Sequence, residues 1–304
     1  MELSIPSLVQ PSLRDLYWAL YSAPLFGRSD QPGVDLCQAG LGDGRSPGAV
    51  RRVLRGWDHA DSPFVRDLSQ RRDRRLGTYF EALLAAYLRH DPAYDLLAQG
   101  QPIRAGGRTV GEIDLLYREQ ATGEVVHLEV AVKFYLSVQG QPDWADWVGP
   151  NPTDRLDRKW PRMQAHQATL LQQPAGRAWL AARGWPQPVS RVLIKGATFV
   201  HAKMPGRVIP DRAYAQHIQG RWLRRSEAAA YLPHMAPWWQ PLPRLAWLAA
   251  AAHLPPTTGQ RPAQWLAQVG QRPVQARAWD ESGQQPGLRL MLVPDHWPGL
   301  PPRR

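Results

Sequence analysis

The chain has 304 residues, enough for one large domain or two modest ones with an ample core. It carries 37 Lys and Arg against 26 Asp and Glu, a net charge of +11. This excess favours polyanionic partners such as nucleic acid, although a solvated basic surface gives the same balance. The single cysteine, Cys37, excludes an internal disulfide and argues against a structural zinc site.

Nothing in the sequence indicates secretion or membrane insertion. The first residues lack a basic leader followed by an apolar stretch. The longest apolar stretch, 245–254, is too short to span a bilayer. The sequence therefore predicts a soluble, cytoplasmic protein without membrane contact, and it leaves the oligomeric state open.

The first third is predicted to be helical with long loops. A helix is expected over Leu13–Tyr21, and the Gly-rich stretch 40–44 favours a surface loop because no Lys-Ser/Thr of a phosphate-binding loop follows it. A charged stretch, 51–75, comes next. Apolar residues then recur at helical spacing over 76–88, with Pro92 ending the helix. Glu81 lies beside that apolar stripe.

Three strands are predicted after this helix. The first covers 96–104 and ends at a Gly-Gly turn, the second covers 109–118, and the third covers 125–136. A short polar loop, 119–124, joins the second strand to the third and is compatible with a hairpin.

The second and third strands carry charged residues among apolar ones. Side chains alternate along a strand, so Glu112 and Asp114 share one face, and Glu129 shares a face with Lys133. Charged groups on apolar strands are costly unless they pair or hold a metal. The pattern thus predicts either a site or ion pairs, with Asp114 beside Arg118 or Lys133, and Glu129 beside Lys133.

A helix is predicted within 154–173, where apolar side chains mark one face. Basic side chains at helical spacing mark another face: Arg155, Arg158, Lys159, Arg162 and His166. Pro161 fits this helix only in its first turn. The stripe is either a solvated face or a set of phosphate contacts.

A buried strand is predicted at 191–200, which completes the order helix, three strands, helix, strand: an α/β fold with mixed sheet and flanking helices. The last third holds half of the 14 Trp and half of the 30 Pro. Its expected helices are 226–232, 243–253 and 262–269, and its expected strands are 274–279 and 288–293. The predicted organisation is an N-terminal helical and loop extension (1–75), a core (76–200) and an α+β extension packed on the core (201–304).

The order of Glu81 on a helix, Asp114 on one strand, Glu129 on the next, and then a basic helix resembles the PD-(D/E)XK nuclease superfamily over about 76–200. The chain as a whole resembles a bacterial domain-of-unknown-function family of the DUF1853 type within it. The resemblance implies a restriction-endonuclease-like αβββαβ core. It also implies Mg²⁺ (or Mn²⁺) on strand carboxylates and hydrolysis of phosphodiester bonds in DNA or RNA.

Carried over by position, the resemblance makes Asp114, Glu129 and Glu81 the metal ligands. The superfamily places its lysine two residues after the second acid, where this chain has Ala131. Lys133 lies on the same face two residues further on, and it is the candidate to orient water or stabilise phosphate oxygens. Arg155, Arg158, Lys159 and Arg162 are the candidate nucleic-acid contacts.

Three functional hypotheses follow. The first is a metal-dependent nuclease-like enzyme with Asp114, Glu129 and Lys133 as catalytic residues. The second is a catalytically inactive protein of the same fold that binds nucleic acid or a protein partner. The third is an interaction protein in which the acidic strands carry structural ion pairs. The acids favour the first, and the displaced lysine leaves room for the second.

Overall fold

The fold is described from a computed structural model, which describes residues 3–71, 73, 75–249, 259–280 and 286–299. The chain divides into two compact units, each of two segments. The first unit comprises Met1–Val132 and Lys159–Lys195, and the second comprises Lys133–Arg158 and Gly196–Arg304. This division differs from the predicted one, because residues 133–158 belong with the last third of the chain.

The predicted α/β class is confirmed: in the described part of the chain, ten strands are joined by hydrogen bonds into one mixed sheet. The first unit draws on strands β1 (Val34–Leu36), β2 (Tyr94–Ala105), β3 (Arg108–Glu119), β4 (Val125–Ser137) and β6 (Val189–His201). Strands β2 to β4 form an antiparallel meander, and β1 runs parallel to β6. The three strands expected after the first long helix therefore exist, and they are one to three residues longer than predicted.

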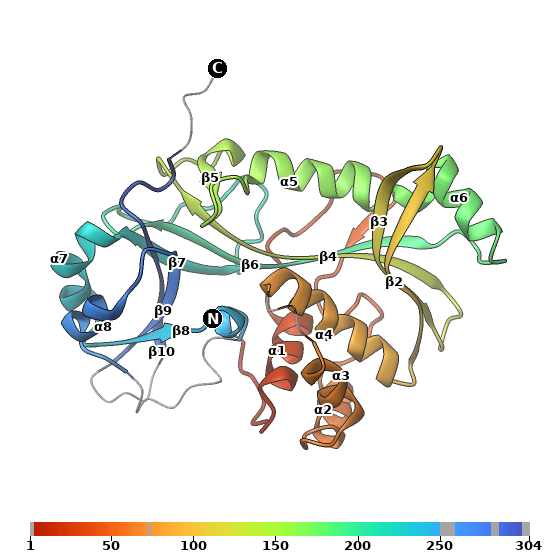
Figure 1. The fold of residues 1–304 in the computed structure, drawn as a ribbon, viewed down its shortest axis with the longest axis horizontal. Helices are drawn as coiled ribbons and strands as arrows, with labels where there is room; N and C mark the ends of the chain where they lie inside the picture. The colour runs from red at the N-terminus through yellow and green to blue at the C-terminus, as the bar shows by residue number, and fades with distance from the viewer. Residues whose placement is uncertain (1–2, 72, 74, 250–258, 281–285, 300–304) are drawn as a thin grey trace. The chain divides into compact units, whose positions relative to one another are not determined.

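The helices of the first unit are α1 (Pro11–Tyr21), α2 (Pro47–Gly56), α3 (Pro63–Ser69), α4 (Leu76–His90) and α6 (Pro174–Ala181). Ser46 and Ser62 cap α2 and α3 by accepting hydrogen bonds from Ala49 N and Val65 N, and a proline at the first helical position follows each cap. Helices α1 to α4 lie together, with α4 against β2 and β3 (Figure 1).

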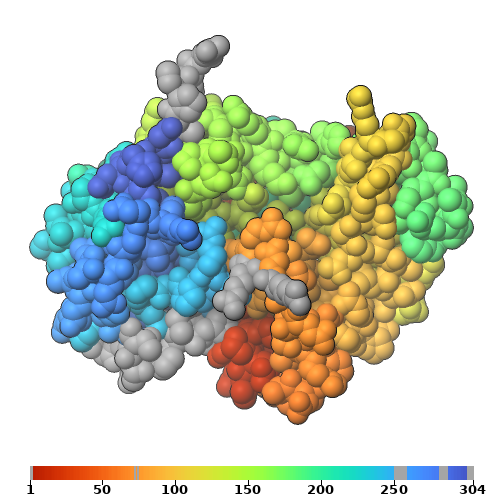
Figure 2. All heavy atoms as spheres, in the orientation of Figure 1, coloured from red at the N-terminus to blue at the C-terminus, as the bar shows by residue number. Residues whose placement is uncertain are grey.

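A second helical layer of this unit covers β2 and β3. In Figure 2 the surface of α6, in green, adjoins the yellow surface of the strands. Apolar side chains of the strands and of this helical layer form one core, which contains Ile103, Ile113, Leu116, Val125, Leu170, Leu171 and Leu180. The same strands carry the acidic residues, so this core holds their backbone in place.

The segment predicted as one helix over 154–173 is broken into three pieces. Helix α5 covers Leu156–Arg162, a π-helical turn η2 covers Met163–Gln167, and a 3₁₀ turn η3 covers Leu170–Gln172. Pro161 lies near the C-terminal end of α5, so the expectation that it occupies the first turn is wrong. Proline has no N–H for the preceding turn, and the chain widens into the π turn directly after it.

The second unit contains β5 (Trp147–Val148), β7 (Ile218–Arg224), β8 (Trp238–Leu242), β9 (Val274–Trp279) and β10 (Pro286–Val293), with α7 (Arg225–Met235) and α8 (Pro262–Gln268). The short 3₁₀ turns η1 (Trp144–Asp146) and η4 (Arg244–Trp247) also lie here. Its strand order runs from the second half of β6 through β7, β10 and β9 to β8.

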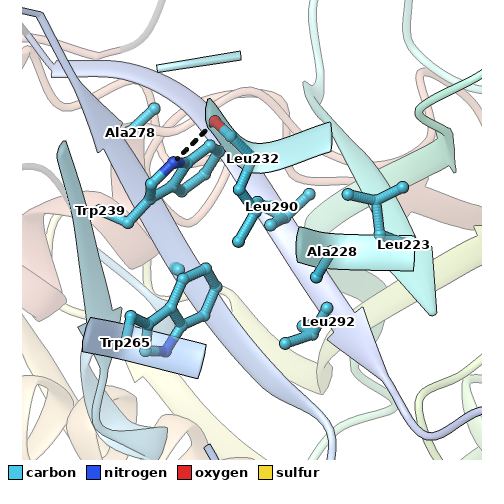
Figure 3. Packing of buried hydrophobic residues seen from close by; sticks show 9 residues of the cluster. Leu223, Ala228, Leu232, Trp239, Trp265, Ala278, Leu290 and Leu292 are labelled. Carbon is cyan, nitrogen blue, oxygen red and sulfur yellow. Dashed lines mark hydrogen bonds between the residues drawn. The ribbon is translucent and has the colours of Figure 1, made fainter. Parts of the chain in front are cut away.

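Tryptophan side chains contribute to the core of this second unit. Trp239 and Trp265 stack at 5.8 Å between ring centroids and pack with Leu232 and Leu290 (Figure 3). The indole N–H of Trp239 donates to the Leu232 carbonyl at 3.4 Å. The helix predicted over 243–253 is the 3₁₀ turn η4 in its first part, and residues 250–258 lie outside the described residues.

Among the residues that the structure describes, no helix is long and apolar enough to cross a membrane.

Candidate functional site

The candidate site lies where the pairing of β3 with β4 ends. The antiparallel ladder runs from Arg118↔Val125 to Leu115↔Leu128, and continuing that register places Asp114 opposite Glu129. Opposite residues of an antiparallel pair share a face. The Asp114 Oδ2 atom accepts a hydrogen bond from Val130 N at 2.9 Å. The Asp114 side chain therefore bonds β4 just past the point where the backbone hydrogen bonds between β3 and β4 end. The two predicted ligands are therefore brought together.

Glu129 is fully buried, at 0% exposure, and both of its oxygens are held. Oε1 lies 3.2 Å from His127 Nε2, and Oε2 accepts a hydrogen bond from Gln167 Nε2 at 3.2 Å. Burial lowers the pKa of His127 to about 4, so its ring is neutral near pH 7. Glu129 thus has a fixed orientation supplied by neutral groups.

Gln167 reaches the site because the π turn is pressed against β3. A side chain on Gly111 of β3 would place its Cβ 2.7 Å from Leu170 Cδ1, so any larger residue there would force the Leu170 side chain to shift. Leu170 begins the 3₁₀ turn η3, three residues after the π turn, and is buried. A π turn adds one residue to a helical turn, and such turns are frequent at functional sites.

Lys159 of α5 lies near the carboxylates of Asp114 and Glu129. Its Nζ donates to Gln167 Oε1 at 2.8 Å, and its positive charge lowers the pKa of both Asp114 and Glu129. The Gln167 amide therefore hydrogen-bonds both the Lys159 ammonium and the Glu129 carboxylate. Lys159 was predicted as a phosphate contact, and the structure places it beside the carboxylate pair.

Glu81 approaches from α4, as predicted. A Cβ placed on Gly100 of β2 would lie 3.9 Å from Glu81 Oε1 and 3.9 Å from Glu112 Oε1, so both carboxylates point over this glycine. Gly100 has φ +56°, a left-handed conformation that glycine adopts without strain. Glu129 is buried, Asp114 and Glu81 are half-buried, and Glu112 is exposed, so the acidic groups extend from the interior to the surface.

The carboxylates of this cluster hold protons unusually well. Burial raises the pKa of Asp114 to about 7, and the negative charge of Glu129 adds to the rise. Burial raises the pKa of Glu129 and of Glu81 to about 7 as well, and the charge of Asp114 contributes for Glu81. Positive charges oppose this rise without outweighing burial: Lys159 lowers the pKa of Asp114 and Glu129, and Arg71 lowers that of Glu81.

The number of side-chain ligands is too small for a metal site built from protein groups alone, but it is sufficient for Mg²⁺. Within the described ranges no group of three or more His, Cys, Asp and Glu side chains is arranged to hold a metal ion. Mg²⁺, however, keeps several waters and is commonly bound through one or two carboxylates, which Asp114 and Glu129 provide. The ligand role of Glu81 stays a prediction; its negative charge raises the pKa of Glu129.

Three other predicted site residues, Lys133, Arg155 and Arg158, belong to the second unit, and the first two form hydrogen bonds with carboxylates. Lys133 Nζ donates to Asp154 Oδ2 at 2.6 Å, so its partner differs from the Asp114 or Glu129 expected for an ion pair. Arg155 forms two hydrogen bonds with Asp157, at 3.0 and 2.7 Å. Arg158 is exposed, as is Arg162 of the first unit. Neither of these two arginines joins an ion pair in the described part of the chain.

Sequence reasoning missed Gln167 and His127 as partners of Glu129. His127 stands two residues before Glu129 on the same strand, so strand alternation was a usable signal for it. Gln167 offered no such signal, because its reach depends on the π turn and not on the 3.6-residue period of an α-helix.

The chain matches a family model described as "Domain of unknown function (DUF1853)" over residues 14–290. This match covers most of the sequence, and the chain belongs to that family. No curated protein and no solved structure matches it.

Proposed function

We propose that this member of the DUF1853 family is a metal-dependent nuclease-like enzyme of the PD-(D/E)XK type that hydrolyses phosphodiester bonds in nucleic acid. The observation that carries the proposal is the pairing of Asp114 with Glu129 at the end of a strand ladder, beside an ammonium group. Asp114 Oδ2 accepts from Val130 N at 2.9 Å, and the pKa of each carboxyl is raised to about 7.

In this proposal Asp114 and Glu129 hold Mg²⁺ or Mn²⁺, with Glu81 as an auxiliary ligand. The bound ion would lower the pKa of a water molecule and offset charge on the phosphate. Gln167 and His127 fix the Glu129 carboxylate through its two oxygens, at 3.2 Å each. Partners of this kind orient a ligand and support its affinity.

We assign the role of the superfamily lysine first to Lys159. Its charge acts on both acids, and its Nζ is held by Gln167 Oε1 at 2.8 Å. It would stabilise phosphate oxygens or orient the attacking water. Lys133 is the alternative, although its ammonium is engaged by Asp154 at 2.6 Å. Arg158 and Arg162 are exposed on α5 and would contact the nucleic-acid backbone.

The second candidate is a catalytically inactive protein of this fold that binds nucleic acid or a protein partner. It is favoured by Ala131, which is buried at 8% exposure where the superfamily has its lysine. It is also favoured by the ion pair that occupies Lys133.

The deciding experiment combines calorimetry with a cleavage assay. Wild-type protein should bind Mg²⁺ or Mn²⁺ and cut single- or double-stranded DNA or RNA. Asp114→Asn and Glu129→Gln should lose both activities while remaining folded. Glu119→Gln makes the same chemical change at the loop end of β3 and, although it is destabilising, should keep metal binding. Cleavage that survives a chelator would refute the proposal, and metal binding without any cleavage would favour the inactive alternative.

The lysine assignment has its own test. Lys159→Ala should abolish cleavage while largely preserving metal affinity, because an ammonium is not a metal ligand. If Lys133→Ala does so and Lys159→Ala does not, the role belongs to Lys133. In that case Ala131→Lys combined with Lys133→Ala should restore part of the activity, since position 131 lies on the same strand face.

A further inference from the structure

A pocket of about 240 Å³ lies in the second unit, away from any residue assigned above. It is bounded by β6, β7, β10 and the loop between β6 and β7. Its lining consists of Thr198, Val200, Gly206, Arg207, Val208, Gln219, Gly220, Arg221 and Leu288. Two arginines and one amide thus meet an apolar surface in one concavity.

Neutral groups position both arginines. Arg221 of β7 donates from Nη1 to the Met204 carbonyl at 3.0 Å and from Nη2 to the Gly206 carbonyl at 3.2 Å. Arg207 donates from Nε to Gln219 Oε1 at 2.7 Å. These bonds fix the guanidinium planes without cancelling their charge, because no acceptor is a carboxylate.

The charges of this pocket stay uncompensated in the described part of the chain, since neither Arg207 nor Arg221 joins an ion pair there. The sequence around them is basic as well. Residues 203–225 contain a single acid, Asp211, and these basic residues: Lys203, Arg207, Arg212, Arg221, Arg224 and Arg225. Two positioned guanidinium groups with spare N–H donors form a site suited to an anion, and their fork geometry matches phosphate oxygens.

The remaining wall suits an organic group. Val200, Val208 and Leu288 supply apolar surface. The hydroxyl of Thr198 is already engaged by His217 Nε2 at 2.6 Å, so this pair adds little to ligand binding. The volume falls just below the roughly 300–1,000 Å³ typical of drug-sized ligands, which favours a small ligand or one unit of a polymer.

We infer that this pocket binds the phosphate group of a nucleotide-sized ligand, with Arg207 and Arg221 on the phosphate and the apolar wall against the organic part. The ligand is either a free nucleotide or one nucleotide of a nucleic-acid strand, and both present the same chemistry. This inference goes beyond the proposed cleavage, because it concerns binding by the second unit and needs no metal.

Calorimetry on the full chain at low salt, with a chelator present, tests the inference. The probes are inorganic phosphate, a nucleoside 5′-monophosphate and a single-stranded oligonucleotide. Arg207→Gln and Arg221→Gln should each weaken binding on the order of tenfold, since each removes a charge-assisted hydrogen bond. Arg225→Gln is the matched control, because it removes the same charge from a residue that does not line the pocket.

Binding of the monophosphate, tighter than inorganic phosphate and dependent on both arginines, supports a free nucleotide as ligand. Arginine-dependent binding of the oligonucleotide alone supports the polymer as the source. Absence of binding to all three probes overturns the inference, as does binding that Arg225→Gln weakens as much as Arg207→Gln does. Arg207 is exposed, so Arg207→Gln should fold. The test therefore remains decisive even if Arg221→Gln does not fold. The chelator separates this outcome from failure of the proposed metal site.

Discussion

The two ends of the β3–β4 hairpin carry the same residue types in opposite electrostatic settings. At the loop end, Arg191 bonds Glu119 at 2.5 Å and Glu124 at 2.7 Å. At the other end, Asp114 and Glu129 face each other, and the positive charge of Lys159 lowers the pKa of both. At the loop end a guanidinium therefore binds the acidic side chains, whereas at the other end two carboxylates lie opposite each other.

The largest effect is expected from breaking the paired end. Glu119→Gln should lower the free energy of unfolding by about 2–4 kcal/mol, because it leaves the Arg191 charge with a single carboxylate partner in a buried setting. Glu119 is 6% exposed, so water replaces little of the lost interaction. Chemical denaturation measures the change. A loss below 0.5 kcal/mol, the ordinary scatter of surface substitutions, would contradict the contrast between the two ends.

The unpaired end should respond in the opposite direction. Burial raises the pKa of Asp114 from its usual 3.8 to about 7, so the folded state holds a proton that the unfolded state releases. The resulting stability is complete below pH 4 and is lost as the pH rises towards 7. Asp114→Asn has no proton to lose and should be more stable than wild type at pH 8.

Measuring unfolding of both proteins from pH 4 to pH 8 tests this sign. The difference should be absent near pH 4, grow up to about pH 7 and then level off. Added Mg²⁺ should raise the stability of wild type alone, since a ligand of the folded state stabilises it. If the variant is less stable at every pH, Asp114 serves the fold and not a cation.

The sequence predicted the parts of this site that depend on strand alternation. The apolar runs at 109–118 and 125–136 predicted two adjacent strands, and the short loop between them predicted a hairpin. The register that sets Asp114 against Glu129 comes from the structure. The buried face of the basic helix was also predicted, because Leu156, Trp160 and Met163 recur at helical spacing and are 0–1% exposed. In each case a regular period carried the information.

What the sequence did not predict depends on departures from those periods. Strand β7 was missed because its sequence, with Gly220 among polar residues, lacks clean alternation. Strand β8 was missed because it contains Pro241, which is tolerated here because β8 lies at the edge of the strand order. Gln167 was missed because a π turn places it. The engagement of Lys133 by Asp154 is a tertiary contact between residues 21 positions apart.

A smaller effect is expected from the neutral groups that orient Glu129. Gln167→Ala removes the amide that bonds Glu129 Oε2 at 3.2 Å and Lys159 Nζ at 2.8 Å. Metal affinity should fall by about tenfold, as for other outer-shell partners of ligating carboxylates. Calorimetry with Mn²⁺ measures it. Gln172→Ala, a nearby glutamine that bonds Ser190 instead, is the control and should leave the affinity unchanged. Equal losses in both variants would indicate a general effect on folding.

The smallest effect extends the contrast between paired and unpaired charges to the basic helix. Arg158 and Arg162 are exposed on α5, whereas Arg155 is held by Asp157 at 2.7 Å. Each phosphate contact removed should flatten the log–log dependence of nucleic-acid affinity on salt by about 0.7–0.9. The double variant Arg158→Ala/Arg162→Ala should therefore lose roughly twice that slope. Arg155→Ala should change it less, because its charge is already matched within the helix. Binding titrations between low and physiological salt measure the slopes. If the double variant keeps the wild-type affinity and slope, the stripe is a solvated face, and nucleic-acid contact has to come from elsewhere in the molecule.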